Sequence, residues 1–250
     1  GILLYTGICF LDLPPAVWLA VAGGLLALYL RKARWLMIGA AAGFAVIVGM
    51  ALLGPGRPTR VYWSPYQKLT ITPRVENGDT ISYVLNTNGN WYQHILNLSP
   101  EFVTAHPQLF DDVPAEWNTY NVPYHFYPHP ESVLVLGAGT GNDVAAAVRN
   151  GAQRVGAVEV DPLILKLGHE LHFEKPYQSP KVEAVTDDAR SYLQTSDDKF
   201  DLIMFSLLDS HTTSSHFTNI RIDNYVYTLE ALDQARRHLR DTGLMMVKFQ

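Results

Sequence analysis

The chain has 250 residues, a formal net charge of −5 at pH 7 and 48% hydrophobic residues. This length allows one full domain with a smaller unit beside it. A mildly acidic chain without a long basic run gives no reason to expect nucleic-acid binding. Cys9 is the single cysteine, which excludes an intrachain disulfide and a cysteine-rich metal site. We expect no metal cofactor.

The first 55 residues are strongly apolar and carry only four charged side chains: Asp12, Arg31, Lys32 and Arg34. Residues 35–54 form an uncharged run of twenty residues, the length of a helix that crosses a bilayer. A shorter apolar run, residues 14–30, begins with two prolines, which suit the first turn of a helix. We therefore predict a transmembrane helical hairpin over residues 1–55, with membrane lipid as a partner.

The chain opens directly on the apolar stretch GILLYTGICF. A signal peptide would start with basic residues and have a shorter apolar core, so this stretch is better explained as the tail of an earlier span. We expect the chain to be a piece of a longer multi-pass membrane protein. Basic residues lie on both sides of the second apolar run, so they do not decide its orientation.

Residues 56–122 form a segment whose first part is predicted to be β-rich. The stretch VYWSPYQKLTITP is rich in β-branched and aromatic residues. Asn77-Gly78 and Asn88-Gly89 are signals for tight turns. Two or three short antiparallel strands are expected here, followed by a proline-rich connector at residues 123–130.

Residues 123–250 alternate between short apolar runs and helical patterns. Strands are expected at SVLVLG, RVGAVEV, KVEAV, FDLIMFSLL and GLMMVKF, with helices between them and a long last helix at residues 225–239. This alternation predicts a parallel sheet with right-handed crossovers. The expected fold class is α/β, a Rossmann-like sheet of methyltransferase type that stops after its fifth strand.

Three glycines mark the turn after the first of these strands: Gly137, Gly139 and Gly141. Glycines at such a turn let a nucleotide approach the backbone and the N–H groups that start the next helix. Glu159, at the end of the second strand, is placed to accept hydrogen bonds from both ribose hydroxyls. Asp188 follows the third strand, where it could meet an adenine amino group or simply cap its helix.

An NAD-dependent oxidoreductase is the alternative that the glycine turn raises. Asn142 stands where the dinucleotide fingerprint has its last glycine, which disfavours that alternative. The position of Asp188 also argues against it.

The ordered stretches VLVLGAGTGNDV, VEVDP, DDARSYL and FDLIMFSLLDSHT resemble the spermidine synthase-like branch of the class I methyltransferase superfamily. Upstream, YWSPYQKL and NWYQHI resemble that family's N-terminal β-segment, and the apolar front end resembles its membrane-anchored bacterial members. The resemblance implies a pocket for S-adenosylmethionine or its decarboxylated form as donor substrate. It also implies that Gln67 faces the donor's tail, that Glu159 binds the ribose, and that Asp188 or its neighbour Asp187 binds the adenine.

The chain departs from the aminopropyltransferase pattern at two positions. These enzymes carry an Asp pair after the fourth strand; here Ser206 replaces the first and catalytic Asp, and Asp209 matches the second. Thr140 stands in the glycine loop where these enzymes place an Asp that contacts the donor's amino group. Asp209, Ser206 and Tyr225, together with His211, remain the candidate acid–base groups.

The leading hypothesis is a membrane-anchored transferase that moves an aminopropyl or methyl group to an unknown acceptor, with an amine as one candidate. The alternative is a non-catalytic nucleotide sensor attached to a transporter-like membrane protein. A homodimer is one expected assembly. The soluble part is expected in the cytoplasm, because the donor nucleotide is made there.

Overall fold

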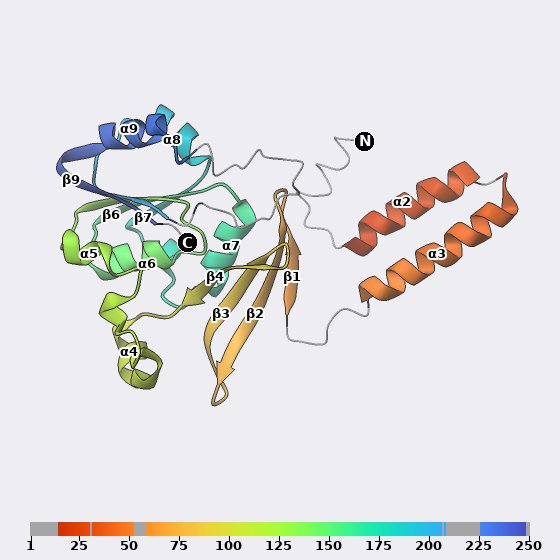
Figure 1. Ribbon diagram of the computed structural model, residues 1–250, viewed down its shortest axis with the longest axis horizontal. Coiled ribbons are helices and arrows are strands. Elements are labelled where there is room, and N and C mark those ends of the chain that lie inside the picture. The colour runs from red at the N-terminus through yellow and green to blue at the C-terminus, as the bar shows by residue number, and fades with distance from the viewer. Residues whose placement is uncertain (1–14, 31, 53–58, 207, 209–225, 249–250) are drawn as a thin grey trace.

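The computed structural model describes residues 15–30, 32–52, 59–206, 208 and 226–248 (Figure 1). Within these ranges the chain forms a helical hairpin, a four-stranded antiparallel sheet and a five-stranded parallel sheet with helices on both faces.

The hairpin consists of α2 (Pro15–Leu30) and α3 (Arg34–Leu52), which lie side by side and project away from the two sheets (Figure 1). A tight link joins the helices, and the Ala33 N–H donates to the Leu30 carbonyl at 2.7 Å. Many apolar side chains of the hairpin are exposed, Tyr29 at 84% and Trp35 at 83% among them. The two predicted helices therefore form, and at nearly the predicted residues.

Their assignment as membrane-spanning helices needs correction. Among the described residues, none of the helices has both the length and the apolar character that crossing a membrane requires. The 16 residues of α2 rise by only about 24 Å along the helix axis, whereas the hydrocarbon core of a bilayer is about 30 Å thick.

The antiparallel sheet contains four consecutive strands: β1 (Arg60–Trp63), β2 (Lys68–Glu76), β3 (Asp79–Thr87) and β4 (Asn90–Leu96). The predicted turns Asn77-Gly78 and Asn88-Gly89 both connect strands, and both residues of each turn have positive φ, as a two-residue hairpin turn requires. There is one more strand than the sequence predicted, because VYWSPYQKLTITP bends at SPYQ into β1 and β2. The Ser64 hydroxyl holds that bend by accepting hydrogen bonds from the N–H groups of Tyr66 and Gln67.

Short helices connect the two sheets: α4 (Pro100–Ala105), η1 (Pro107–Phe110), η2 (Ala115–Trp117) and α5 (Pro123–Phe126). The predicted proline-rich connector at residues 123–130 begins with α5. Its Tyr124 is buried in the core beneath the parallel sheet, so this connector is packed against the domain that follows it.

The parallel sheet has the order β7-β6-β5-β8-β9. Its elements along the chain are β5 (Ser132–Leu136), α6 (Asn142–Arg149), β6 (Arg154–Glu159), α7 (Pro162–Leu171), η3 (Pro176–Gln178), β7 (Val182–Thr186), α8 (Ala189–Thr195), β8 (Phe200–Phe205), α9 (Leu229–Arg237) and β9 (Leu239–Val247). Every described pairing in it is parallel. Strands β5, β6 and β7 extend the sheet in one direction, and β8 and β9 extend it in the other. The direction changes between the neighbouring strands β5 and β8, and in such folds ligands bind at that point.

Alternate residues of β5 enter different cores. Val133 and Val135 pack with α6 on one face, whereas Leu134 and Leu136 pack with α8 and α9 on the other. Figure 1 shows α6 on one side of the sheet and α8 and α9 on the other. A third core joins α7 to β2 and β3, so α7 lies between the parallel sheet and the antiparallel sheet. The predicted Rossmann-like α/β fold is confirmed.

Two boundaries near the end of the described chain differ from the prediction. The last helix starts at Leu229 rather than Tyr225, because the Thr228 hydroxyl caps it by accepting from the Ala231 N–H. The fifth parallel strand begins at Leu239, before the predicted turn at Thr242-Gly243, and its pairing with β8 is irregular at that point.

Candidate active site

A loop of three glycines lies at the carboxyl end of β5. Gly137, Gly139 and Gly141 have φ values of 74°, 57° and 103°, a left-handed conformation that side chains disfavour. The Tyr177 hydroxyl donates to the carbonyls of Ala138 and Gly139 and so fixes the loop from one side. Helix α6 begins at once, so its free N–H groups point toward this edge of the sheet.

Glu159 meets the loop from the end of β6. Its Oε2 accepts a hydrogen bond from the Gly139 N–H at 2.8 Å, and its Oε1 accepts one from the Asp161 N–H at 2.9 Å. The side chain is buried. Burial raises the pKa of Glu159 to about 7, although the two N–H groups oppose that rise. The predicted convergence of the loop and this carboxylate is therefore present in the structure.

Asp161 connects this carboxylate to the antiparallel sheet. Its side chain caps α7 by accepting from the Leu163 N–H, and it accepts the Ser64 hydroxyl at 2.6 Å. Gln67 lies close to it, with its Nε2 3.5 Å from Asp161 Oδ2. The bend between β1 and β2 is thus held against the start of α7, which brings the predicted residue Gln67 to the same edge as Glu159.

Asp187 and Asp188 follow β7 at that edge. The Asp187 N–H donates to the Glu159 carbonyl. Asp188 caps α8, because its Oδ1 accepts from the N–H groups of Arg190 and Ser191 at 2.9 and 3.1 Å. The capping role considered for Asp188 is therefore present, and it uses the Oδ1 atom of the carboxylate. We call Ser64, Gln67, Glu159, Asp161, Asp187 and Asp188 the β6–β7 side of the site.

Tyr66 belongs to the same neighbourhood. Burial, followed by the charges of Asp161, Glu159 and Asp188, raises the pKa of its phenol. The carboxylates of Asp161, Glu159 and Asp188, at the ends of β6 and β7, thus disfavour ionisation of the half-exposed Tyr66 phenol. Tyr66 is not among the predicted site residues. Its place beside Gln67 in the SPYQ bend is the sequence signal that could have found it.

The opposite side of the loop contains polar atoms that lack partners. Gln93 Nε2 and Ser206 Oγ are buried and have no hydrogen-bond partner among the described residues, and the same holds for Thr140 Oγ1 in the loop itself. Unpaired buried polar groups are costly, and in native structures they call for an explanation such as a ligand or ordered water. Ser206 and Thr140 are predicted site residues; Gln93 is not one of them and lies in the NWYQHI stretch.

A buried ion pair completes this side. The Lys248 ammonium, at the end of β9, binds Asp143 Oδ1 in the first turn of α6. It also lies 4.7 Å from the centre of the Tyr120 ring. The two charged side chains are 8% and 5% exposed. We call Gln93, Asp143, Ser206 and Lys248 the β8–β9 side of the site.

A small cavity of about 10 Å³ lies on the β8–β9 side of the loop. It is lined by Tyr92, Gln93, Tyr120, Gly137, Ala138, Gly139, Asn142, Asp143 and Ser206. The Gln93 amide lies against Gly139, and the Leu208 side chain lies so close to Gly137 that a β-carbon there would clash with it. Gln93 and Leu208 thus cover these two glycines.

Three predicted acid–base residues, Asp209, Tyr225 and His211, lie outside the described residues. Over the part of the chain that the structure describes, no group of three metal-ligating side chains is found.

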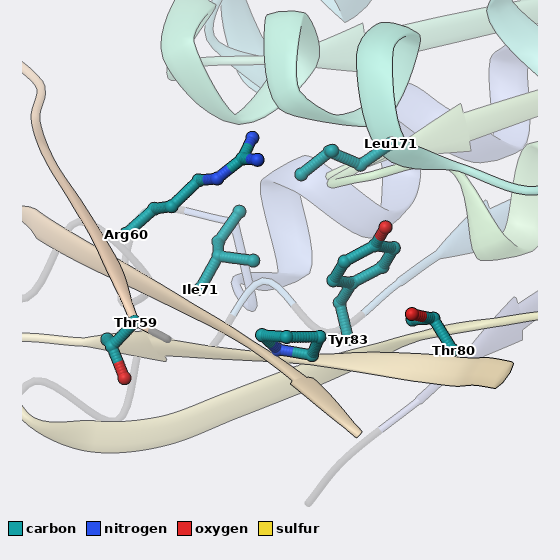
Figure 2. Close-up of a pocket in the computed structure, with 7 residues that line it drawn as sticks. Thr59, Arg60, Ile71, Thr80, Tyr83 and Leu171 are labelled. Atoms are coloured by element: carbon teal, nitrogen blue, oxygen red, sulfur yellow. The ribbon is translucent and has the colours of Figure 1, made fainter. Parts of the chain in front are cut away.

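A larger cavity of about 480 Å³ lies away from this edge, between β1–β3 and the end of α7 (Figure 2). Its lining residues are Thr59, Arg60, Ile71, Pro73, Thr80, Tyr83 and Leu171. Figure 2 shows Leu171 and Tyr83 facing one another across it. None of the predicted site residues lines this cavity, so it is separate from the glycine loop.

Sequence reasoning also missed Asp143 and Lys248 as members of the site. Asp143 directly follows Gly141-Asn142 in the sequence, and its place beside the glycine turn is the signal that could have found it. Lys248 gave no local signal, because its place beside Asp143 depends on the pairing of β9 with β8.

Comparison with known proteins gives a consistent result. Residues 118–248, just over half of the chain, match the spermine/spermidine synthase domain. A polyamine aminopropyltransferase of Korarchaeum cryptofilum (strain OPF8) is 26% identical over 121 residues, which are 47% of this chain and 35% of the relative. One from Aquifex aeolicus (strain VF5), polyamine aminopropyltransferase 1, is 26% identical over 141 residues, 52% of this chain and 50% of the relative. The chain thus spans half or less of the length of these curated relatives.

A solved structure agrees on the fold. A spermidine synthase crystallised with the transition-state analogue AdoDATO matches with a TM-score of 0.51 at 18% identity, covering 72% of this chain and 54% of that one. With the domain match over residues 118–248, the conclusion is that this chain belongs to the spermine/spermidine synthase domain family.

Proposed function

We propose that this chain is a transferase that binds an S-adenosylmethionine-type nucleoside at the carboxyl edge of its parallel sheet and transfers the donor's alkyl tail to an amine. The observation that carries the proposal is the hydrogen bond from the Gly139 N–H to the Glu159 carboxylate. It places a backbone that a nucleotide can approach beside an acceptor for ribose hydroxyls. The family membership and the names of the relatives support the same reaction class.

The strand order gives the donor a direction along this edge. Asp188 follows β7 and Glu159 ends β6, so the adenine and the ribose would lie on the β6–β7 side. The glycine loop follows β5, and Ser206 follows β8. The tail and the reacting carbon would therefore lie on the β8–β9 side, where Gln93 Nε2 and Ser206 Oγ have no partner among the described residues.

The proposed reaction is a displacement at the methylene carbon bonded to the sulfonium. The nitrogen lone pair of the amine forms a new C–N bond, the C–S bond breaks, and its electron pair stays on sulfur. The products are methylthioadenosine and an alkylated amine, which releases one proton. The amine must be neutral when it attacks, and a positioned acceptor accelerates the step. Ser206 has no charge with which to take that proton, so we assign the role to Asp209 or Tyr225.

The test is product analysis with the full chain. We expect methylthioadenosine to accumulate when S-adenosylmethionine or its decarboxylated form is supplied together with putrescine, 1,3-diaminopropane or spermidine. Glu159→Ala should abolish this release, because the ribose loses its acceptor. Glu183→Ala is the matched control, since Glu183 is on β7 with a side chain that is 70% exposed. Absence of methylthioadenosine with every donor and amine would refute the proposal.

A second candidate is a non-catalytic nucleotide-binding domain, and Ser206 is the observation that favours it. A serine stands where aminopropyltransferases carry the catalytic Asp. The same incubation separates the candidates. Binding of the nucleoside without any product would indicate the sensor, and S-adenosylhomocysteine in place of methylthioadenosine would indicate methyl transfer.

We also propose that the protein acts in the cytoplasm, where its donor is made, and that the α2–α3 hairpin contacts membrane lipid. The exposed apolar side chains of the hairpin support the lipid contact, among them Leu28, Tyr29, Trp35 and Leu36. Co-sedimentation with phosphatidylglycerol vesicles tests it. A Leu28→Glu/Leu36→Glu variant should lose binding, and equal sedimentation of both proteins would contradict the contact. The homodimer stays a prediction.

A further inference from the structure

The ion pair of Lys248 and Asp143 has no part in the reaction proposed above. Its charges are buried, and the ammonium also faces the Tyr120 ring. A buried ion pair is weak evidence for stability, because removing both charges from water costs about as much as their attraction returns. Its position, rather than its strength, is therefore the feature to explain.

The pair lies at the end of the site where the donor's tail would be. Lys248 directly follows β9, and its N–H donates to the Phe205 carbonyl at the end of β8. Asp143 lines the same small cavity as Gly139, Gln93 and Ser206. The Asp143 carboxylate, with the Lys248 ammonium bonded to it, thus shares this cavity with buried polar atoms of Gln93 and Ser206 that have no partner within the described chain.

We propose that this pair selects a donor with a complete α-amino-acid tail, which is intact S-adenosylmethionine rather than its decarboxylated form. The inference rests on the proposed function and deepens it. The tail's ammonium is complementary to the Asp143 carboxylate, and the tail's carboxylate is complementary to the Lys248 ammonium. Gln93 Nε2 and Ser206 Oγ are two further donors that suit that carboxylate.

The decarboxylated donor carries only the ammonium. It would gain from Asp143, but it would share that carboxylate with the Lys248 ammonium and bring no negative charge of its own to balance the second cation. Like charges brought together in a buried site oppose binding, and this repulsive element supplies the discrimination. Aminopropyltransferases are no reference for this pair. The resemblance places their contact with the donor's amino group at the position of Thr140, not at Asp143 or Lys248.

The test is calorimetric binding of three probes to the full chain: S-adenosylmethionine, decarboxylated S-adenosylmethionine and methylthioadenosine, which has no charged tail. We expect S-adenosylmethionine to bind at least about tenfold more tightly than the decarboxylated form. Lys248→Met should weaken S-adenosylmethionine and strengthen the decarboxylated form, so that the preference reverses. Asp143→Asn should weaken both.

A structural role for the pair would change all three affinities in parallel. Methylthioadenosine binding is the internal reference, and it should change less than about threefold in each variant. The double variant Asp143→Leu/Lys248→Met keeps a packed apolar pair and should bind both tailed donors equally. Arg154→Met is the matched control, since it removes an exposed ion pair with Asp198.

Two results would overturn the inference. Tighter or equal binding of the decarboxylated donor by the unchanged protein is one, and an unchanged preference in Lys248→Met is the other. In both cases methylthioadenosine would still bind, and the proposed function would stand. If no probe bound at all, including methylthioadenosine, the proposed function would fail and this inference would fail with it.

Discussion

The two sides of the glycine loop differ in how their polar groups are satisfied. On the β6–β7 side, both Glu159 oxygens accept backbone N–H groups, and Asp161 joins a helix cap to the Ser64 hydroxyl. On the β8–β9 side, Gln93 Nε2 and Ser206 Oγ are buried without a partner among the described residues. The polar groups named on the first side are hydrogen-bonded within the fold. The unpaired polar groups on the second side call for a bound ligand or an ordered water.

We therefore expect the β6–β7 side to contribute mainly to the stability of the fold, and the unpaired groups of the β8–β9 side to contribute mainly to ligand specificity. Substitutions on the β6–β7 side should cost stability, because they break hydrogen bonds that the fold already makes. Substitutions of the unpaired groups on the β8–β9 side, Gln93 and Ser206, should change which ligand binds and leave the fold intact or more stable.

Glu159 should make stability depend on pH. Its pKa in the folded chain is about 7, against 4.5 for an unperturbed Glu. Between these values the folded chain holds a proton that the unfolded chain has lost, so stability falls as the pH rises, by up to about 3 kcal/mol. Urea unfolding of the parent and of Glu159→Gln at pH 4.5, 6 and 7.5 measures this. Glu159→Gln should lose the extra slope, and parallel pH profiles would show that the pKa is not raised.

Gly168 should be the position where α7 cannot accept a side chain. A β-carbon there would lie 2.5 Å from the Thr140 carbonyl oxygen and 2.7 Å from Tyr177 Cε2. Gly168→Ala should destabilise the chain by about 1–3 kcal/mol, because backbone has to shift. Gly39→Ala in α3 is the control: its β-carbon meets nothing within 4 Å, and it should stabilise by up to about 1 kcal/mol. Equal thermal unfolding of both variants would refute the close contact of α7 with the loop.

Ser206 and Ser64 lie on opposite sides of the glycine loop, so the same substitution to Ala can be compared at both. Ser206→Ala should stabilise the chain by about 1 kcal/mol, because it removes a buried hydroxyl with no partner among the described residues. Ser64→Ala should destabilise it by about 1–2 kcal/mol, since that hydroxyl bonds Asp161 and two backbone N–H groups. Chemical denaturation gives both values. Loss of stability in Ser206→Ala would mean that this hydroxyl already has a partner.

Asp188 can be separated into a cap and a ligand contact. Asp188→Ser retains a capping oxygen and should change stability by only a few tenths of a kcal/mol, whereas Asp188→Ala should cost about 1 kcal/mol. Both should weaken methylthioadenosine binding to a similar extent, because both remove the carboxylate assigned to the adenine. If Asp188→Ser bound the nucleoside as the parent does, Asp188 would be a helix cap alone.

The sequence was sufficient for Glu159 and Asp188, because each lies at or just after the end of a strand. The SVLVLG and RVGAVEV strands are adjacent and parallel, so the glycine loop and Glu159 had to meet at one edge. The cap at Asp188 was one of the two roles considered for it. Gln67 came from the family resemblance, and Ser64 and Asp161 were not predicted. The turns at Asn77-Gly78 and Asn88-Gly89 could also be predicted, since both residues of such a turn have positive φ, which Asn and Gly tolerate.

The β8–β9 side was not accessible in this way. The pairing of Lys248 with Asp143 joins residues 105 positions apart and depends on the register of β9, which the predicted turn at Thr242-Gly243 misplaced. The transmembrane assignment had a related weakness. Apolar composition identified both helices of the hairpin, but the 16 residues of α2 are too few to cross the hydrocarbon core of a bilayer.

Methylthioadenosine binding to the full chain and to Glu159→Ala tests the central claim most directly, because this probe needs the loop and the ribose acceptor but no tail contact. Two hydrogen bonds to a buried carboxylate would be lost in the variant, so its affinity should fall at least about a hundredfold. Equal affinity of the two proteins, or no binding by the unchanged chain, would contradict the claim that Gly139 and Glu159 together form a nucleoside site.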